Sequence, residues 1–437
     1  MTDSTSRREF LHRAASATAA TGFLTSLGAP EEVLADPRPI PKAALRHPLG
    51  RYEPVRMGVI GTGGMGTGHC ESIVGLAKKG LTDVRIEALC DVCQPRLLAA
   101  KAKVDEGQGG SVPTYADYRA LLAVKELHGV LIATPEHWHA KMAEDAIEAG
   151  KDVYVEKPMT LRLKEALRLW DVARTNPEVI ANVGTQFVMT PSYRAARDLI
   201  AQGAIGKPVS SQTGYCRNSK DGEWLYYAID PAWQPGVNVD WKRWCGHLGG
   251  VPWDPEVYAR WRRYRRYSTG IIGDLLVHQM TPLIQAIGLG WPTRVTAAGG
   301  HYIDKKMENH DQVNLTIEFE DEHTMIVAGS TANEMGLEIV IRGHKGNLYV
   351  GGRNAVLRPE RLFAEELEER TIVGEDHGDD QDALRMKWLE CIRTREAPPS
   401  PVELGVKVMV IVDLATRSMW EGKAFGYNAA ARKVRKL

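Results

Sequence analysis

Val55-Arg-Met-Gly-Val-Ile-Gly-Thr-Gly-Gly-Met-Gly66 joins a short apolar run to a turn built mostly of glycine. The apolar residues 55–60 predict a buried parallel strand, and the periodicity of residues 65–79 predicts a helix after the turn. Three glycines of the turn have the spacing G-x-G-x-x-G: Gly61, Gly63 and Gly66. The first glycine of this spacing permits a tight turn, the second lets the backbone approach a pyrophosphate, and the third lets helix and strand pack closely. The phosphates of a dinucleotide would bind the free N–H groups at the start of the helix.

Asp91 follows the next apolar run, residues 84–89, which predicts a second strand. An acidic side chain at this distance from the glycine turn accepts a hydrogen bond from the 2′-hydroxyl of a ribose. Its charge would repel a 2′-phosphate, so the sequence favours NAD over NADP. A glycine-rich turn without a ligand is the alternative. The strand, the helix and Asp91 together favour a dinucleotide site, in which we include Met65.

The rest of the chain divides into two patterns. Over residues 54–187, apolar runs of strand length alternate with segments of helical periodicity, among them a helix expected at 141–149. This alternation predicts an α/β domain with a doubly wound parallel sheet. Over residues 188–437, most runs have strand length and are joined by short turns, so we expect a second α/β domain with a large, mostly antiparallel sheet.

The N-terminus has the three parts of an export signal. Ser6-Arg7-Arg8-Glu9-Phe10-Leu11 precedes an apolar stretch of small residues, 14–27, and residues 33–35 offer small side chains for cleavage. The paired arginines resemble a twin-arginine (Tat) signal, and a disordered basic tail is the alternative. We therefore expect a signal peptide over residues 1–35, an arm over residues 36–53 and a periplasmic or other extracytoplasmic protein. The apolar stretch is too short and too polar for stable membrane insertion.

The composition is that of an ordinary soluble globular protein. Of 437 residues, 43% are hydrophobic and 25% are charged, and the formal net charge is zero. This balance gives no reason to expect a nucleic-acid partner. Six cysteines are few for an exported protein. Cys90 and Cys93 form a C-x-x-C pair without the second pair of a zinc site, so we expect structural thiols near the adenosine pocket.

Polar residues follow three of the predicted parallel strands, at the edge where open sheets bind ligands. Those that we expect to contact the cofactor are Thr134, Pro135, His139, Glu156 and Gln186. Lys157 could donate to a substrate hydroxyl and stabilise a developing alkoxide, or it could be a solvated lysine at a strand end. His137 and His139 lack a third ligand nearby, so we expect no metal and a structural hydrogen bond from His137.

Asp274 and His278 lie four residues apart in a run of the second domain that predicts a helix. On a helix their side chains share a face, and a carboxylate beside an imidazole fixes its tautomer and raises its basicity. Such a pair suits removal of a proton from a carbinol. From these residues alone, a helix N-cap aspartate and a buried histidine with satisfied ring nitrogens are the simpler interpretation.

Four motifs together resemble the glucose–fructose oxidoreductase/inositol dehydrogenase (Gfo/Idh/MocA) family. They are G-x-G-x-x-G at Gly61, T-P-x-x-x-H ending at His139, E-K-P at residues 156–158 and G-D-x-x-x-H ending at His278. The resemblance runs from about residue 55 to residue 420. It implies a Rossmann domain and a large sheet whose open face mediates homo-oligomers. It also implies three residues around the nicotinamide, with the histidine as acid/base and the lysine assisting: Lys157, Asp274 and His278.

Residues 215–267, called the Trp/Arg-rich segment below, are not explained by these motifs. They contain six of the eleven tryptophans and a run of arginines between residues 260 and 266. Flat aromatic rings suit carbohydrate rings, but Trp and Tyr are equally typical of a packed insertion or an oligomer contact. We expect the arginines to pair across an interface rather than to meet an anionic sugar.

Three functional hypotheses follow. The first is an exported oxidoreductase that moves hydride between a carbinol of a sugar or sugar derivative and NAD, with the cofactor tightly bound and recycled within each cycle. The second is a redox-neutral, NAD-dependent glycosidase, in which one substrate is oxidised, undergoes elimination and is reduced again. The third belongs to another class, a binding or scaffold protein that keeps NAD as a structural group.

Overall fold

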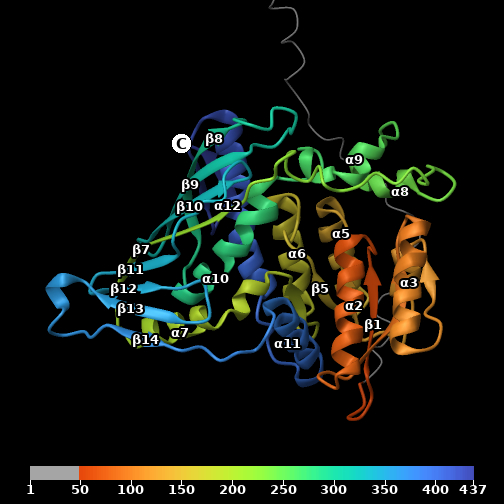
Figure 1. Ribbon diagram of the computed structural model, residues 1–437, viewed down its shortest axis with the longest axis horizontal. Helices are drawn as coiled ribbons and strands as arrows, with labels where there is room; N and C mark the ends of the chain where they lie inside the picture. Colours follow the sequence, from red (N-terminus) through yellow and green to blue (C-terminus); the bar gives the residue numbers. More distant parts are fainter. Residues whose placement is uncertain (1–48) are drawn as a thin grey trace, which may run out of the picture. The chain divides into compact units, whose positions relative to one another are not determined.

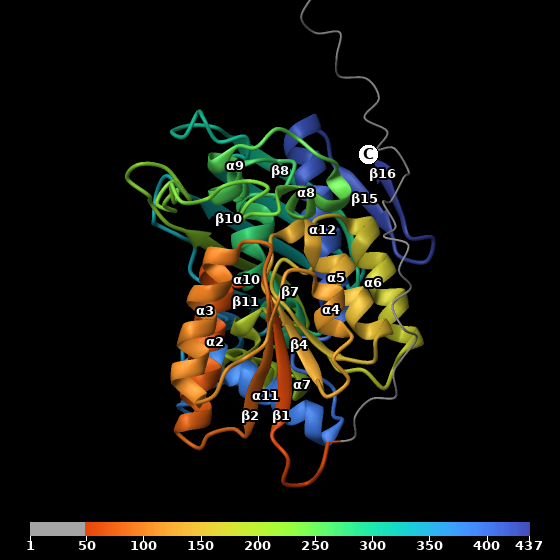
Figure 2. The same ribbon diagram turned by 90° about the vertical axis from the view of Figure 1, so that its right-hand side faces the viewer.

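The computed structural model describes residues 49–437. The predicted export signal and residues 36–48 of the predicted arm lie outside the described residues. Six strands of the described part form a parallel sheet in the order β3-β2-β1-β4-β5-β6, with helices on both faces (Figures 1 and 2). This order and layering are those of a Rossmann domain. The strands are β1 (Val55–Ile60), β2 (Val84–Cys90), β3 (Thr114–Tyr115), β4 (Gly129–Ile132), β5 (Asp152–Val155) and β6 (Ala181–Val183).

Most strands and helices of this domain form where the apolar pattern predicts them. Every residue of β4 and β5 is buried, as expected for strands that helices cover on both faces. The helices are α2 (Gly64–Lys78), α3 (Gln94–Gln108), α4 (Tyr118–Leu122), α5 (Glu136–Glu148) and α6 (Leu163–Thr175). One predicted boundary is wrong, since α5 begins at Glu136 and not at residue 141. Its first turn is polar yet buried, so it lacks the apolar periodicity of a surface helix.

Ten strands of the described part form the second sheet, in the order β14-β13-β12-β11-β7-β10-β9-β8-β15-β16. β7 and β10 pair in parallel, and the other neighbours are antiparallel. Buried and exposed residues alternate along β9, so one face of the sheet packs inward and the other is open. The two sheets confirm the predicted fold class. The strands are β7 (Pro208–Cys216), β8 (Pro292–Gly300), β9 (Gln312–Phe319), β10 (Thr324–Ser330), β11 (Val340–Gly343), β12 (Gly346–Tyr349), β13 (Ala355–Pro359), β14 (Arg370–Ile372), β15 (Phe425–Asn428) and β16 (Lys433–Lys436).

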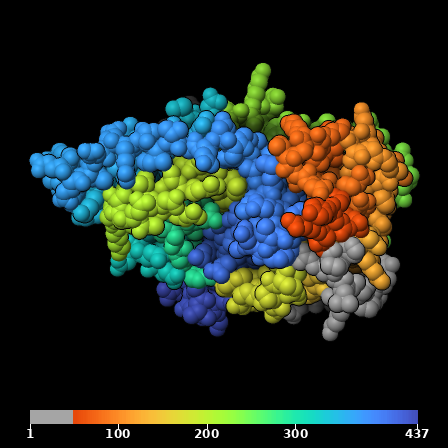
Figure 3. Space-filling view, turned by 90° about the horizontal axis from the view of Figure 1, so that it is seen from below, coloured from red at the N-terminus to blue at the C-terminus, as the bar shows by residue number. Residues whose placement is uncertain are grey.

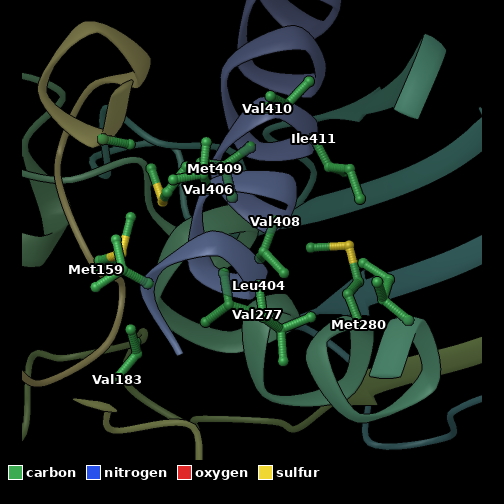
Figure 4. Packing of buried hydrophobic residues seen from close by; sticks show 14 of the residues in the cluster. Met159, Val183, Val277, Met280, Leu404, Val406, Val408, Met409, Val410 and Ile411 are labelled. Atoms are coloured by element: carbon green, nitrogen blue, oxygen red, sulfur yellow. The ribbon is translucent and has the colours of Figure 1, made fainter. Parts of the chain in front are cut away.

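Helices α10 and α12 lie between the two sheets (Figure 1). The helices of this half are α7 (Pro191–Ala201), α8 (Trp241–Cys245), α9 (Pro255–Ala259), α10 (Val277–Ile287), α11 (Asp380–Thr394) and α12 (Val402–Glu421). Figure 4 shows the apolar side chains of α12 packed with Val277 and Met280 of α10 and with Met159, which follows β5. A Cβ on Gly405 would lie 2.6 Å from the sulfur of Met159, so this glycine allows the close approach. The packing fixes the segment after β5 against the start of α10.

Helix α11 packs in the core of the first sheet, although it comes late in the chain. Its buried residues Leu384, Trp388 and Ile392 join the apolar cluster that contains Val55 and Met57 of β1. Figure 3 shows this blue part of the chain directly beside the red and orange residues of the first sheet's domain. Within residues 49–437, every helix is too short or too polar to span a bilayer.

Candidate active site

The glycine turn after β1 leaves room for a ligand at one position. Gly61 has φ +89°, and a Cβ there would lie 2.8 Å from the backbone of Ala133, while a Cβ on Gly66 would lie 1.8 Å from the carbonyl oxygen of Gly61. These two glycines are therefore required by packing of the chain on itself. A Cβ on Gly63 would meet nothing closer than Arg96 Nη1 at 3.7 Å. No side chain of the described part caps α2 at Gly63, so its first N–H groups are available to phosphate oxygens.

Asp91 ties the glycine turn to the end of β2. Its carboxylate accepts hydrogen bonds from the backbone N–H of Thr62 at 2.6 Å and from the N–H of Cys93 at 2.8 Å. The Thr62 hydroxyl donates to the same carboxylate at 3.2 Å. A carboxylate has about four lone-pair positions, so capacity for a ribose hydroxyl remains. Cys90 and Cys93 beside it are buried free thiols.

A cavity of about 660 Å³ begins at this turn, a volume typical of a cofactor site. Six residues predicted from the sequence line it: Gly61, Gly63, Met65, Asp91, Thr134 and Pro135. Gly66 lies behind the turn, and three further predicted cofactor residues contribute to no wall of this cavity: His139, Glu156 and Gln186. The size, the open position at Gly63 and the free N–H groups fit a dinucleotide.

His139 links the segments that follow β4 and β5. Its Nδ1 lies 2.7 Å from the carbonyl oxygen of Pro158, and its Nε2 lies 2.7 Å from the carbonyl oxygen of Thr134. Burial lowers the pKa of this imidazole, although both hydrogen bonds oppose the shift. His137 makes the expected structural hydrogen bond, from Nε2 to the carbonyl oxygen of Trp244 at 2.7 Å. In residues 49–437, no three potential metal ligands lie together.

Glu156 belongs to a buried chain of hydrogen bonds. Arg385 Nε donates to His69 Nδ1 at 2.8 Å, so the other ring nitrogen of His69 carries its proton and donates to Glu156 at 2.9 Å. Burial alone would raise the pKa of Glu156, but the hydrogen bond from His69 and the charge of Lys157 lower it to about 2. Glu156 is therefore an ionised group that accepts from the backbone N–H of Lys157 at 3.1 Å. This hydrogen bond holds the backbone of Lys157 in place.

Lys157, Asp274 and Arg262 form a buried ionic cluster. Lys157 Nζ donates to the carboxylate of Asp274 at 3.0 Å and to its backbone carbonyl at 2.9 Å. Arg262 Nε donates to the same carboxylate oxygen at 2.8 Å. Burial would raise the pKa of Asp274, but the two cations and their hydrogen bonds hold it well below its usual range. Asp274 thus fixes the ammonium in place, and Lys157 is not a solvated strand-end lysine.

The expected pairing of Asp274 with His278 is not observed. Asp274 lies in a π-helical turn, η4 (Ile272–Leu276), and turns its carboxylate to the two cations, which attract it more strongly than a neutral imidazole. His278 has a buried Nδ1 without a hydrogen-bond partner in the described residues. Burial, followed by the charge of Lys157, lowers the pKa of His278 to about 3. The imidazole is therefore neutral and lies near the ammonium.

Aromatic and polar residues complete the surroundings of His278. The rings of Phe187 and Tyr215 lie 5.6 Å and 6.1 Å from its ring centre. Gln186, next to Phe187, has a buried Oε1 without a partner in the described residues. A donor from a bound molecule would satisfy this oxygen, since a buried acceptor without a hydrogen bond is costly.

Glu136 is a site residue that the sequence reasoning missed. Its fully buried carboxyl accepts from the hydroxyl of Ser268 at 2.6 Å. Burial, and then the charge of Asp274, raise the pKa of Glu136 to about 8, so it is a neutral acid near pH 7. The only signal for it was an acid directly after Thr134-Pro135 at the end of a buried strand.

The arginine run was expected at an interface, but the arginines that it contains have partners within the chain. Arg262 binds Asp274, as described above. Arg263 donates to Asp304 at 2.6 Å, and Arg266 donates to the carbonyl oxygen of Gly249 at 3.1 Å. Spacing alone could not show these partners, because none of them lies at a helical or strand spacing from its arginine.

Comparison with known proteins agrees with this geometry. Residues 55–184 match an oxidoreductase family model described as an NAD-binding Rossmann fold, and residues 246–427 match the C-terminal alpha/beta domain of the same family. The chain belongs to the Gfo/Idh/MocA family of oxidoreductases. The NAD-binding domain is therefore a property of its family.

Relatives of this Gfo/Idh/MocA chain carry sugar-related names. Inositol 2-dehydrogenase 1 of Saccharopolyspora erythraea is 34% identical over 157 residues, which cover 36% of this chain and 44% of that protein. A glycosyl hydrolase family 109 protein of Shewanella baltica is 29% identical over 243 residues, covering 51% and 50%. The chain thus spans about half the length of the curated relatives it matches. A levoglucosan dehydrogenase solved with NADH has the same fold, with a TM-score of 0.66 and 18% identity over 86% of this chain and 99% of that one.

Proposed function

We propose that the chain is an exported, NAD-dependent oxidoreductase that acts on a carbinol of a sugar or sugar derivative. The observation that carries this proposal is the buried group of Lys157, Asp274 and a neutral His278. Such a group can hold an alcohol oxygen and remove its proton. The names of the relatives, an inositol dehydrogenase and a levoglucosan dehydrogenase, support a polyhydroxy substrate.

Different residues bind the cofactor, hold the substrate oxygen and remove its proton. Phosphates bind the free N–H groups of α2 beside Gly63, and Asp91 accepts from the ribose, which favours NAD over NADP. When bound, NAD supplies the hydride acceptor. Lys157 donates from Nζ to the carbinol oxygen, and Asp274 holds that ammonium in place. His278 takes the hydroxyl proton at Nε2, because its Nδ1 is enclosed by protein.

The cofactor stays bound and is recycled within each catalytic cycle. Free nicotinamide cofactor is scarce outside the cytoplasm, and the twin-arginine route suggested by Arg7 and Arg8 carries proteins that are already folded. Reoxidation then requires a second substrate that accepts the hydride, or return of the hydride to the first sugar.

Return of the hydride describes the second candidate function, a redox-neutral glycosidase. The relatives named for glycosyl hydrolase family 109 favour it. Oxidation of a hydroxyl beside the anomeric region acidifies a neighbouring C–H bond, loss of that proton expels the aglycone, water adds to the resulting double bond, and the carbonyl is reduced again. The net reaction is hydrolysis. His278 and the neutral Glu136 are the nearby groups able to exchange protons.

One experiment separates the two candidates. Purified protein without added NAD is incubated with aryl glycosides and, separately, with free sugars. Continued release of aglycone supports the glycosidase, whereas NADH that stops at one equivalent per protein supports an oxidoreductase awaiting its acceptor. If the Lys157→Met and His278→Ala variants turn over every tested sugar as fast as the natural chain, the proposed site is wrong. Bound NAD without turnover in the natural chain would favour a scaffold.

A further inference from the structure

The Trp/Arg-rich segment, residues 215–267, lies partly between the two family matches, which leave residues 185–245 uncovered. It contains helices α8 and α9. Figures 1 and 2 agree that both helices lie at the end of the first sheet where α2 and α3 begin. The glycine turn is at this same end, so the segment stands over the cofactor site.

Backbone hydrogen bonds attach the segment to the turn between β2 and α3. The N–H of Asp240 donates to the carbonyl oxygen of Val92 at 2.9 Å, and the N–H of Gln94 donates to the carbonyl oxygen of Asn238 at 2.8 Å. Cys93 and Val239 therefore face each other as an antiparallel pair of the non-hydrogen-bonded type. This bridge involves the turn that also carries Asp91.

Side chains strengthen the attachment. The guanidinium of Arg96 lies 4.7 Å from the ring centre of Trp233 and 4.8 Å from that of Tyr258, and it donates to the Tyr258 hydroxyl at 3.2 Å. Arg243 donates to the carbonyl oxygen of Ala116 at 3.2 Å. Beneath these contacts lies a buried cluster that is separate from the two larger cores: Cys93, Val239, Trp241, Trp244, Cys245, Tyr258, Trp261 and Tyr267.

The same segment supplies one wall of the 660 Å³ cavity. Trp244, Tyr258 and Arg243 line it together with Asp91 and Arg96. In this fold, the region after β2 holds the adenosine half of a dinucleotide. Flat aromatic faces and a guanidinium plane suit an adenine ring, which stacks on both.

We infer that residues 233–258 of this segment form a clasp that closes over the adenosine half of NAD and slows its release. The inference rests on the proposed function, in which the cofactor stays bound between turnovers. Exchange of the cofactor requires the clasp to open. Opening breaks the bridge at Cys93 and Val239 and separates Arg96 from its two aromatic partners. Arg262, which binds Asp274 in the ionic cluster, lies outside the clasp.

Trp233→Ala tests the clasp without removing a cavity side chain, because Trp233 does not line the cavity. The protein is loaded with NADH, chased with excess NAD and followed by the loss of NADH fluorescence. We expect release to become about tenfold faster, since a stacked cation and ring are lost. The matched control is Trp170→Ala. Trp170 is also half-buried and contacts two arginines, Arg174 at 4.5 Å and Arg432 at 4.9 Å, but it is absent from the cavity wall. It should leave the rate within about twofold.

A second variant locks the clasp instead of opening it. Val239→Cys places a thiol opposite Cys93 in a non-hydrogen-bonded pair, whose Cα atoms lie about 4.5 Å apart, within disulfide range. Oxidation should slow NADH release at least about tenfold, and dithiothreitol should restore it. Val239→Ser, given the same oxidant, is the control. This variant also decides the question if Trp233→Ala does not fold.

The release rates test the clasp separately from the proposed function, which is tested by sugar turnover. Equal release rates in the natural chain, Trp233→Ala and oxidised Val239→Cys would overturn the clasp, even if the natural chain oxidises a sugar. Faster release from Trp233→Ala and slower release from oxidised Val239→Cys support the clasp, even if no tested sugar is turned over.

Discussion

The ammonium group of Lys157 is buried and held in place by Asp274, so substitution of Lys157 tests its proposed donation to the carbinol oxygen. Lys157→Met removes the ammonium that Asp274 holds. We expect kcat to fall by about 10² to 10³, the range for loss of one donor to a developing alkoxide, while NAD remains bound. Lys151→Met is the matched control, because Lys151 is also buried and donates to backbone carbonyls away from the cavity. Turnover and bound NAD are measured on both variants. A similar loss of turnover in both would point to a structural role for Lys157.

Glu136 and His278 give the stability of the folded chain opposite pH dependences. The pKa of Glu136 is raised to about 8, so its contribution is complete below about pH 4.5 and is lost as the pH rises through 8. The pKa of His278 is lowered to about 3, so its contribution is complete above about pH 6.5 and is lost as the pH falls through 3. The two dependences oppose each other between about pH 4.5 and pH 6.5, so these groups make the folded protein most stable in that interval and less stable as the pH rises from 6.5 to 8.

Glu136→Gln isolates the alkaline side of this profile. Glutamine stays neutral and can still accept from Ser268, so we expect the fall in Tm between pH 6 and pH 9 to shrink by several degrees relative to the natural chain. Thermal unfolding followed by circular dichroism at several pH values measures it. Parallel Tm curves for the two proteins would show that Glu136 does not titrate in this interval.

Site residues that are marked by their immediate sequence neighbours could be predicted, whereas residues whose role depends on a partner elsewhere in the chain could not. Lys157 comes two residues after the end of β5, and the glycines define their own turn. Glu136 acquires its role only through Ser268, which contacts it from the second domain, and Arg262 acquires its role through Asp274, 12 residues along the chain. Neither separation is one at which a helix or a strand brings two side chains together.

The turn into α2 allows a test in which neighbouring glycines behave differently. Gly63→Ala places a methyl group toward open space, so we expect the protein to fold normally and to bind NAD at least about tenfold more weakly. Gly66→Ala would overlap the carbonyl of Gly61 and should destabilise the fold itself. Gly75→Ala, on the same helix with open space around it, should stabilise by about 0.5–1 kcal/mol. Calorimetric titration with NAD and thermal unfolding separate the three, and equal NAD affinity in Gly63→Ala would exclude phosphate binding there.

Elements with a simple period were predictable, and those with unusual environments were not. β1 has the bounds that the apolar run of residues 55–60 predicts. The start of α5 and the π-helical turn before α10 were missed, since both bury polar side chains that obscure the helical period. The short strands β13 to β16 depend on pairing partners more than on their own residues.

At the scale of the whole molecule, the open face of the second sheet is the surface on which we expect a second copy to bind. Ile326 lies on that face in β10 and is 45% exposed. Ile326→Glu places a charge there, so the oligomer should dissociate toward the monomer. Light scattering coupled to size exclusion measures the mass. An unchanged mass for Ile326→Glu and for the natural chain would remove this face as the interface.

We expect the protein to be exported with its cofactor already bound. If the twin-arginine route carries a chain already folded around NAD, Arg7→Lys/Arg8→Lys should leave the protein in the cytoplasm, whereas Arg13→Lys in the same N-terminal region should be exported normally. Fractionation of a bacterium that has this pathway, followed by mass spectrometry of the gently denatured protein, measures location and cofactor together. Protein recovered outside the cytoplasm should contain NAD, because little free cofactor is present there to load it. Exported protein without NAD would show that the chain does not carry its cofactor across the membrane, and an exported double-lysine variant would show that another route is used.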